Sequence, residues 1–490
     1  MATATAAGVL MAGAALAGDY NQADIYQFGS ENTLTVDQGS STNGIAGRPG
    51  YMGAQLRQIG DHNDMDVVQS GRKNQVANSQ PSVAYRGAYQ TGNWNVLSIT
   101  QDSGVAAGSA GSTDGNYLEQ VRQNSSTLAG SLTNKATIVQ QRVETGVSTL
   151  AASNNIKLIS QTHTGGASQI NEITVTQTGE HSAWYGGGQG NIITSITQNG
   201  SSNTASVEQK GTGPLLSTSG NQRRGPANTI TTISQLGSTQ TATINQNGFA
   251  NYTGAVSQSG GDGNTIWLEL NGDYNGATPP TANGNRSTVG VLTLNSGAVA
   301  SQVTQIGTSN DINYVTTGNS NQYGFYQNGT DNEAVGITIT GSYNELGVWQ
   351  DGDRNKLLVG TVEGSDNVVG LTQDGNDNTA SLKILGGSSD KNGGYNGFTP
   401  LGDAAGANLT AGLIVQYGDF NNVDLEVNGS DNVFATLQDN AGLGASLSNG
   451  NTIVGKVTGS DNEVAVKQIG NNNNANFVQT GGNNNAYISQ

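Results

Sequence analysis

Apolar and polar residues alternate along most of this chain, and asparagine, glutamine and glycine mark the alternation at fixed intervals. Residues 462–473 follow the rule N-x-φ-x-φ-x-Q-x-G-x-x-N, where φ is an apolar or small residue. The rule begins again at Asn473 and at Asn484, which gives a step of 11 residues. Side chains of a strand point alternately to opposite faces, so the asparagine, both φ residues and the glutamine share one face. Each repeat therefore predicts a strand followed by a glycine-containing turn.

The rule recurs along the chain, for example at residues 21–32, 63–74, 171–179, 203–211, 321–332, 344–355 and 367–378. A strand and a turn repeated at a fixed period are typical of a β-solenoid, in which each coil stacks on the previous one. We therefore predict an all-β fold, a β-solenoid of stacked two-strand coils with about 22 residues per coil and an 11-residue half-repeat. The stacked strands would be cross-β and amyloid-like, with irregular loop insertions at the corners.

Inward-facing amide side chains of successive coils are expected to form ladders along the stack, each side-chain carbonyl accepting from the NH₂ group in the next coil. Such pairing makes buried amides tolerable. The predicted ladder residues are Asn21, Gln27, Asn63, Gln69, Asn171, Gln177, Asn203, Gln209, Asn321, Gln327, Asn344, Gln350, Asn367, Gln373, Asn462, Gln468, Asn473, Gln479, Asn484 and Gln490. The predicted turn glycines are Gly29, Gly71, Gly179, Gly329, Gly352, Gly375, Gly470 and Gly481.

Some repeats depart from the rule. In residues 421–429 and 451–459 a valine replaces the glutamine, which should weaken the ladder on that face. Residues 191–198 and 251–258 contain one extra residue each, which indicates β-bulges.

Proline cannot donate to a strand ladder, so it marks the segments between strands. All seven prolines lie in or beside longer spacers, and further spacers lack proline. The predicted spacer loops lie near residues 39–51, 80–92, 102–115, 211–227, 275–298, 386–408 and 439–450. We predict that residues 18–490 form a single solenoid. Residues 1–17 resemble a signal peptide, because a short apolar run is followed by Ala15-Leu16-Ala17, although no Lys or Arg precedes Arg48.

Composition and charge narrow the function classes. With 72 Gly, 34% hydrophobic and 11% charged residues, the chain is poorly supplied for a conventional core or for amphipathic helices. Its formal net charge of −17 argues against nucleic acid as a partner, because phosphate binding needs a basic surface. Cysteine is absent from the sequence, which excludes disulfides and thiolate chemistry.

Catalytic and metal-binding patterns are weak. The three histidines share no offset in the repeat, and no nucleophile motif with partners is visible, so we expect no enzymatic activity, metal or cofactor. Acidic residues gather in the turns, at Asp331, Asp353, Asp366, Asp377, Asp431 and Asp461, which the repeat places at matching corners. A Ca²⁺ site is one interpretation of stacked carboxylates, but hydrogen bonding within solvated turns is the simpler one.

The motif that runs from Gln468 through Gly470 and Asn473 to Gln479 resembles the curlin repeat of curli-type bacterial functional amyloid subunits. The resemblance implies a protein secreted across both bacterial membranes, through an outer-membrane secretion pore, to an extracellular fibre at the cell surface. It also implies assembly started by a nucleator subunit, and it leaves open whether this chain is the main subunit or the nucleator. The Pro-containing spacers and the large number of repeats depart from the family pattern.

The leading functional hypothesis is a structural protein that assembles head to tail into a homopolymer for biofilm matrix and adhesion. Its end strands would expose unpaired backbone groups, with Ala23, Ile25, Ala486 and Ile488 at the assembly edges. The alternative is a β-solenoid that does not polymerise and serves as an adhesin or ice-binding module, for which rows of outward threonine should recur at one offset. A third possibility, a polysaccharide-active enzyme, needs clustered carboxylates on a sheet face.

Overall fold

The computed structural model describes residues 22–23, 25–38, 44–45, 54–70, 74–76, 86–102, 116–125, 132–145, 154–165, 169–182, 190–212, 228–276, 296–386, 409–441 and 450–490. All regular elements in these residues are β-strands. None of these segments forms a helix long and apolar enough to cross a membrane. The prediction of an all-β solenoid is confirmed, because long rows of parallel strands stack on one another.

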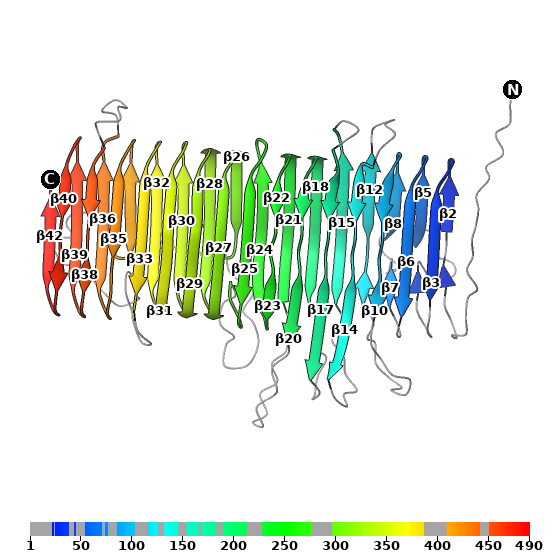
Figure 1. Ribbon diagram of the computed structural model, residues 1–490, viewed down its shortest axis with the longest axis horizontal. Coiled ribbons are helices and arrows are strands. Elements are labelled where there is room, and N and C mark those ends of the chain that lie inside the picture. Colours follow the sequence, from blue (N-terminus) through cyan, green and yellow to red (C-terminus); the bar gives the residue numbers. More distant parts are fainter. Residues whose placement is uncertain are drawn as a thin grey trace. The chain divides into compact units, whose positions relative to one another are not determined.

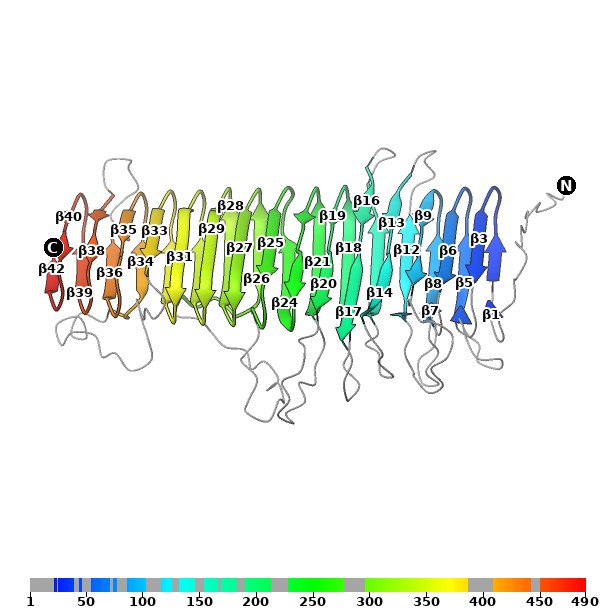
Figure 2. The same cartoon turned by 60° about the horizontal axis from the view of Figure 1, so that its bottom comes forward.

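The chain contains two compact units. The expectation of a single solenoid over residues 18–490 stays a prediction. Unit 1 comprises residues 1–251 with 280–285, and unit 2 comprises residues 252–279 with 286–490. In each unit the strands form two sheets, and consecutive strands of the sequence alternate between the sheets in most coils. Figures 1 and 2 show these parallel rows of strands.

The strands of unit 1 form sheets 1A and 1B. Sheet 1A contains β1 (Gln22–Ala23), β2 (Ile25–Phe28), β4 (Gly44–Ile45), β5 (Ala54–Ile59), β7 (Gln75–Val76), β8 (Arg86–Thr91), β11 (Tyr117–Leu118), β12 (Val121–Ser125), β15 (Asn155–His163), β18 (Ile192–Ser201) and β21 (Asn228–Ser238). Sheet 1B contains β3 (Thr33–Gln38), β6 (Asp64–Ser70), β9 (Asn95–Leu97), β10 (Gln101–Asp102), β13 (Asn134–Ala136), β14 (Gln140–Thr145), β16 (Asn171–Ile173), β17 (Gln177–Ser182), β19 (Thr204–Ala205), β20 (Gln209–Thr212), β22 (Thr241–Ala242) and β23 (Gln246–Gly248).

The strands of unit 2 form sheets 2A and 2B. Sheet 2A contains β24 (Asn251–Ser259), β26 (Val303–Thr308), β28 (Gln322–Thr330), β30 (Glu345–Asp351), β32 (Val368–Asp374), β34 (Leu413–Tyr417), β36 (Val433–Asp439), β39 (Glu463–Ile469) and β42 (Asn485–Ser489). Sheet 2B contains β25 (Thr265–Asn271), β27 (Asp311–Asn319), β29 (Glu333–Ser342), β31 (Lys356–Ser365), β33 (Thr379–Leu385), β35 (Asn422–Glu426), β37 (Thr452–Val454) and β40 (Asn474–Asn476), and a separate short pair is formed by β38 (Val457–Thr458) and β41 (Gln479–Thr480).

Identical positions of successive repeats face one another across the ladder. In β28 and β30, for example, Gln327 pairs with Gln350 in a parallel register that runs without a shift. The core follows the expected period of two. Leu346, Val348 and Gln350 are buried, whereas Trp349, which lies between Val348 and Gln350, is half-exposed. Apolar burial between the two sheets of each unit supplies the main favourable free energy of folding.

The predicted bulges and spacers show where the repeat rule needs adjustment. In β18 the neighbouring Thr194 and Ser195 are both half-exposed, as expected for the extra residue in 191–198. The spacer predicted near 80–92 is shorter than expected, because Arg86–Thr91 is strand β8. The spacer predicted near 39–51 contains the two-residue strand β4, and those near 102–115, 211–227 and 439–450 begin inside the ends of β10, β20 and β36. Residues 1–17, Asn21, Gly71 and most spacer residues lie outside the described residues.

Candidate functional site: the contact between successive coils

Buried glutamines form continuous ladders in which each side chain donates to the next coil. In sheet 1A the ladder runs through Gln27, Gln58, Gln90, Gln123, Gln161, Gln198 and Gln235, with Nε2 to Oε1 distances of 2.6–2.9 Å. A second ladder in sheet 1B joins Gln101, Gln140, Gln177, Gln209 and Gln246. In sheet 2A the ladder joins Gln258, Gln305, Gln327, Gln350, Gln373, Gln416, Gln438, Gln468 and Gln490.

The glutamine ladders run in the opposite sense to the one expected from the sequence. Gln327 Nε2 donates to Oε1 of Gln350 in the following coil at 2.8 Å, so each carbonyl accepts from the preceding coil. The reason lies in the backbone: the same Nε2 also donates to the carbonyl oxygens of Asp311 and Asn332, at 3.0 and 3.2 Å. A backbone carbonyl can be satisfied only by a donor, so it selects the orientation of the amide.

Asparagine ladders at the coil corners have the expected, reverse sense. Asn332 Nδ2 donates to Oδ1 of Asn310 in the preceding coil at 3.0 Å, and the backbone N–H of Asn332 donates to the same oxygen at 3.1 Å. Asn332 Nδ2 also donates to the carbonyl oxygen of Gly352 in the next turn at 2.7 Å. Asn332 therefore ties three coils together. Because asparagine and glutamine amides point in opposite directions, their dipoles partly cancel along the stack.

Sheet 2B replaces the glutamine ladder by an apolar row. At the glutamine position of this sheet, Ile339 faces Val362 across the ladder, and Val362 faces Ile384. The row ends where Val457 faces Gln479. Gln479 Oε1 is buried and has no hydrogen-bond partner in the described part of the chain, because the preceding coil offers a valine instead of an amide donor.

Turn glycines allow the corners of successive coils to touch. Gly352 has φ +112°, and a Cβ atom built on it would lie 2.0 Å from the carbonyl oxygen of Gly375 in the next coil. Such a contact is sterically impossible, so glycine is required both by the dihedral angle and by the close approach. Gly29, Gly329, Gly375, Gly470 and Gly481 also have positive φ. Gly179 is different from the prediction: it lies inside β17 without positive φ, because that strand continues to Ser182.

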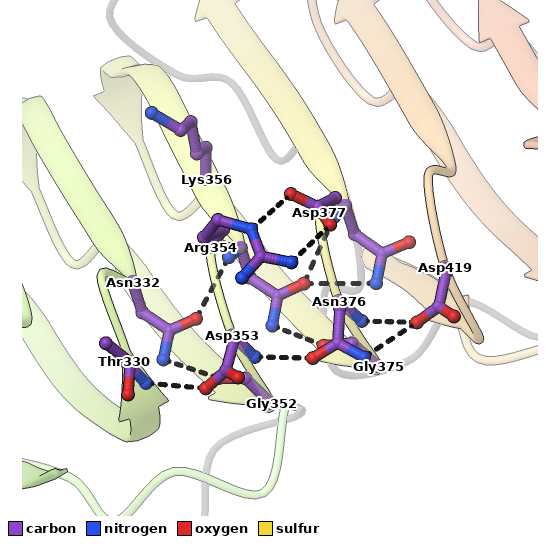
Figure 3. Close-up of polar contacts among 12 residues, drawn as sticks. Thr330, Asn332, Gly352, Asp353, Arg354, Lys356, Gly375, Asn376, Asp377 and Asp419 are labelled. Carbon is purple, nitrogen blue, oxygen red and sulfur yellow. Dashed lines mark hydrogen bonds and ion pairs between the residues drawn. The ribbon is translucent and has the colours of Figure 1, made fainter. Parts of the chain in front are cut away.

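The acidic turn residues lie at the corners as expected, but they occupy two different positions of the turn. Asp353 directly follows a turn glycine, and its Oδ1 accepts the backbone N–H of Thr330 in the preceding coil at 2.8 Å. Asp353 N–H in turn donates to Asn376 Oδ1 at 2.9 Å, which extends an oxygen ladder along the corner (Figure 3). Asp331, Asp366, Asp377, Asp431 and Asp461 instead precede a ladder asparagine and have φ between 56° and 60°.

Arg354 separates two of these carboxylates. Its Nε and one terminal nitrogen donate to the two oxygens of Asp377 at 2.7 Å each (Figure 3). Hydrogen bonding to Asp377 raises the pKa of Arg354, and the negative charge of Asp331 on the other side acts in the same direction. This corner therefore alternates in charge. Among the described residues, no group of three His, Cys, Asp or Glu side chains is arranged to hold a metal ion.

The predicted ladder residues fall into distinct rows. Asn63, Asn171 and Asn203 lie in one corner row of unit 1. Gln69 lies in the sheet 1B row, where it faces Gln38 on one side and Gln101 on the other. Asn321, Asn344 and Asn367 form one row of unit 2, Asn462 and Asn484 belong to a second, and Asn473 follows Asn451 in a third. Gln479 is the exception, since it faces Val457. The rule missed Gln58, Gln90, Gln305 and Gln416, although the Q-x-G part of the repeat is present at each of them.

The expected assembly edges occupy strands at the margins of the stacks. Ala23 pairs with Ile45 and Ile25 with Leu56, while Ala486 and Ile488 pair with Val464 and Val466. Ile25, Ala486 and Ile488 are half-exposed, whereas Val464 and Val466 are buried. Around Gly470 and Gly481 an added Cβ would meet a single atom within 4 Å, an asparagine Nδ2 at 3.8 Å. The outer face of this coil is therefore open within the described residues.

Comparison with known proteins bears on the C-terminal coils. A search among curated proteins found no match. The family model described as Curlin associated repeat matches residues 459–490, which include strands β39, β40, β41 and β42. The family resemblance seen in the sequence is thereby confirmed over these residues, and this part of the chain is a curlin repeat.

Proposed function

We propose that this protein is a secreted structural component that assembles end to end into curli-like extracellular fibres at the bacterial surface, where they serve biofilm matrix and adhesion. The observation that carries the proposal is the contact between coils. Each coil binds the next through the same backbone ladder, the same amide rows and the same glycine approach, so the two faces of a coil are complementary to each other. A contact between unlike faces does not close on itself and generates a filament.

The amide rows give such a filament a direction. Gln27 Nε2 donates to Gln58, so the acceptor oxygen of Gln27 points toward the opposite side of its coil. Gln490 accepts from Gln468 through Oε1, and its NH₂ group carries two protons, of which one is used by the carbonyl oxygen of Asn474 at 3.0 Å. Joining the face of Gln490 to the face of Gln27 continues the ladder donor to acceptor. Two Gln490 faces would meet donor to donor and two Gln27 faces acceptor to acceptor, so the proposal specifies head-to-tail growth.

A nucleator subunit and an outer-membrane secretion pore are the partners that this proposal implies through the family. Whether the chain is the main subunit or the nucleator is a question of kinetics: a nucleator shortens the lag of another subunit at substoichiometric amounts.

The test uses Gly481, which has φ +98° and no backbone atom within reach of an added Cβ. In the equivalent position one coil earlier, an added Cβ on Gly459 would lie 1.9 Å from the carbonyl oxygen of Gly481. Gly481→Ala should therefore leave the monomer folded but obstruct the next copy, and we expect seeded elongation to slow at least about tenfold. Gly297→Ala is the matched control, because Gly297 has φ +92° and only the Trp349 ring nearby, at 3.6 Å.

Elongation is followed by thioflavin fluorescence after dilution from denaturant, together with fibre diffraction for the spacing of about 4.8 Å between strands. Equal elongation rates for Gly481→Ala and Gly297→Ala would contradict the assignment of this face. A wild-type chain that stays a discrete particle at high concentration would contradict the fibre function itself.

One observation favours a second candidate, the ice-binding module. A single outward row of sheet 1B carries hydroxyl groups in five successive coils; its members are Ser98, Thr137, Thr174, Ser206 and Thr243. All five are half-exposed. The neighbouring outward position holds Lys135 and Glu172, which form an ion pair and interrupt a uniform hydroxyl surface. Thermal hysteresis without fibre formation would favour this candidate over the first.

A further inference from the structure

The outer face of sheet 1A carries a row in which tyrosine and arginine alternate from coil to coil. Tyr26 faces Arg57, Arg57 faces Tyr89, and Tyr89 faces Arg122 across the parallel ladder. Tyr26 is 44% exposed and Arg122 is exposed. The guanidinium carbon of Arg57 lies 5.2 Å from the centre of the Tyr26 ring, which is within the range of a cation–π contact.

The cations of this row are not neutralised by carboxylates among the described residues. Arg57 and Arg122 take part in no ion pair there, and Arg57 Nε is buried without a hydrogen-bond partner. Phe28, 65% exposed, adds an apolar surface two residues from Tyr26 on the same face. In a chain of net charge −17, an exposed row of aromatic rings and unpaired guanidinium groups is a local exception.

The outer face of sheet 1B carries the opposite charge in the first two coils. Asp64 and Asp66 alternate with buried side chains on β6. Asp37 lies on the neighbouring strand β3, two residues beyond Thr35, which faces Asp66. Burial raises the pKa of Asp66, and the negative charges of Asp64 and Asp37 raise it further. No ion pair involves these three carboxylates within the described residues. One side of these coils is thus cationic and aromatic, and the other side is anionic.

We infer that the Tyr–Arg row of sheet 1A binds the Asp37, Asp64 and Asp66 surface of a second copy of this chain, so that molecules associate side by side. Charge complementarity selects this occupant, because Arg side chains bind carboxylates through paired donors and keep an aromatic neighbour stacked. The contact joins unlike faces, so each molecule keeps a free face for a further copy and association does not stop at pairs. If the proposed function holds, the same contact also acts within a fibre. It would then join neighbouring filaments at one site per molecule and so keep them in register.

Two charge-reversal variants test the contact in the full-length chain. Arg57→Glu with Arg122→Glu makes both faces acidic, and Asp64→Lys with Asp66→Lys makes both faces basic. We expect each variant alone to lose lateral association at least tenfold, measured as the dissociation constant by sedimentation of the soluble chain and as the bundle width of fibres by electron microscopy. An equal mixture of the two variants should regain the association, because each then meets a complementary face.

The control is Lys456→Glu with Lys467→Glu in unit 2, which changes the net charge by the same amount and should leave lateral association unchanged. Arg57→Gln with Arg122→Gln repeats the loss without introducing negative charge. Increasing the salt from about 10 mM to about 150 mM should weaken the wild-type contact, since screening shortens the range of charge attraction. Variants that associate like wild type, or a mixture that fails to regain association, would overturn the inference. Seeded elongation, measured in parallel, reports separately on the fibre function.

Discussion

At the scale of single residues, the cost of a buried amide depends on what the coils on either side offer to it. In the middle of a ladder, Gln350 accepts from Gln327 and donates to Gln373, both at 2.8 Å, and its NH₂ group also reaches the carbonyl oxygen of Glu333. At the end of the apolar row, Gln479 donates to the carbonyl oxygen of Glu463 at 3.4 Å, while its own oxygen has no partner among the described residues. The same residue type is thus stabilising in one place and costly in the other.

This contrast predicts opposite outcomes for two identical substitutions. Gln350→Leu removes the donor from Oε1 of Gln373 and from the carbonyl oxygen of Glu333 in a dry core, so we expect a loss of about 2–4 kcal/mol in the free energy of unfolding. Gln479→Leu removes an unsatisfied oxygen and should change stability by less than about 1 kcal/mol, in either direction. Urea titration of the monomer measures both. A similar loss for the two variants would show that the ladder bonds do not determine the cost.

A second residue-scale prediction concerns the carboxylates of Asp351 and Asp374, which face each other on the outer side of sheet 2A. Burial raises the pKa of Asp374, and the charge of Asp351 raises it further. An acid whose pKa is raised by folding destabilises the fold when it is ionised, and the penalty disappears as the pH falls through the raised pKa toward the ordinary value of 3.8.

Asp374→Asn should therefore be more stable than wild type at pH 7, by less than about 1 kcal/mol because the side chain is exposed. The difference between the two proteins should vanish below about pH 3, where wild-type Asp374 is protonated in both the folded and the unfolded state. Denaturant unfolding of both proteins across this range measures the difference. If Asp374→Asn is still more stable than wild type by the same amount at the acidic end, the gain in stability does not come from removing the charge.

At the scale of strands, the spacing of the repeat was sufficient to predict the fold, because a period of two residues within a strand and of 11 between strands leaves one face for burial. The core positions of β30 and β32 could be predicted in this way, and Val348 faces Leu371 as the rule requires. The rule failed where a spacer interrupts a coil, so that Gln58 and Gln90 stand far from the asparagine of their own repeat. It also could not predict the direction of the glutamine amides, which is decided by the backbone carbonyls that they meet.

The apolar row of sheet 2B provides a test of register between elements. Ile339 and Val362 face each other on β29 and β31, and both are buried. A single Ile339→Gln or Val362→Gln places one amide in an apolar row, and we expect each to cost about 1–3 kcal/mol. The double variant forms a new side-chain hydrogen bond between the two coils. Its cost should therefore be smaller than the sum of the single costs by about 1 kcal/mol. Additive costs in urea unfolding would contradict the register.

At the scale of the whole molecule, charge opposes the association that the coil contact favours. A net charge of −17 means that two copies repel each other before their coils can touch. Screening reduces this repulsion, because the Debye length falls from about 30 Å at 10 mM salt to about 8 Å at 150 mM. We therefore expect seeded elongation to accelerate several-fold over this range, with a shorter lag.

Salt should have the opposite effect on side-by-side association, which depends on attraction between the Tyr–Arg row and the acidic face of sheet 1B. The two processes can thus be separated in one titration, with elongation followed by thioflavin fluorescence and bundling by electron microscopy. The variant with Arg57→Glu and Arg122→Glu should still elongate faster as salt is added, but without bundles at low salt, since both side chains lie on the outer face of sheet 1A and not on a face through which coils stack. If elongation instead slows as salt is added, attraction between opposite charges drives the contact between coils. The hydrogen-bonded ladders would then not be the main cause of end-to-end association.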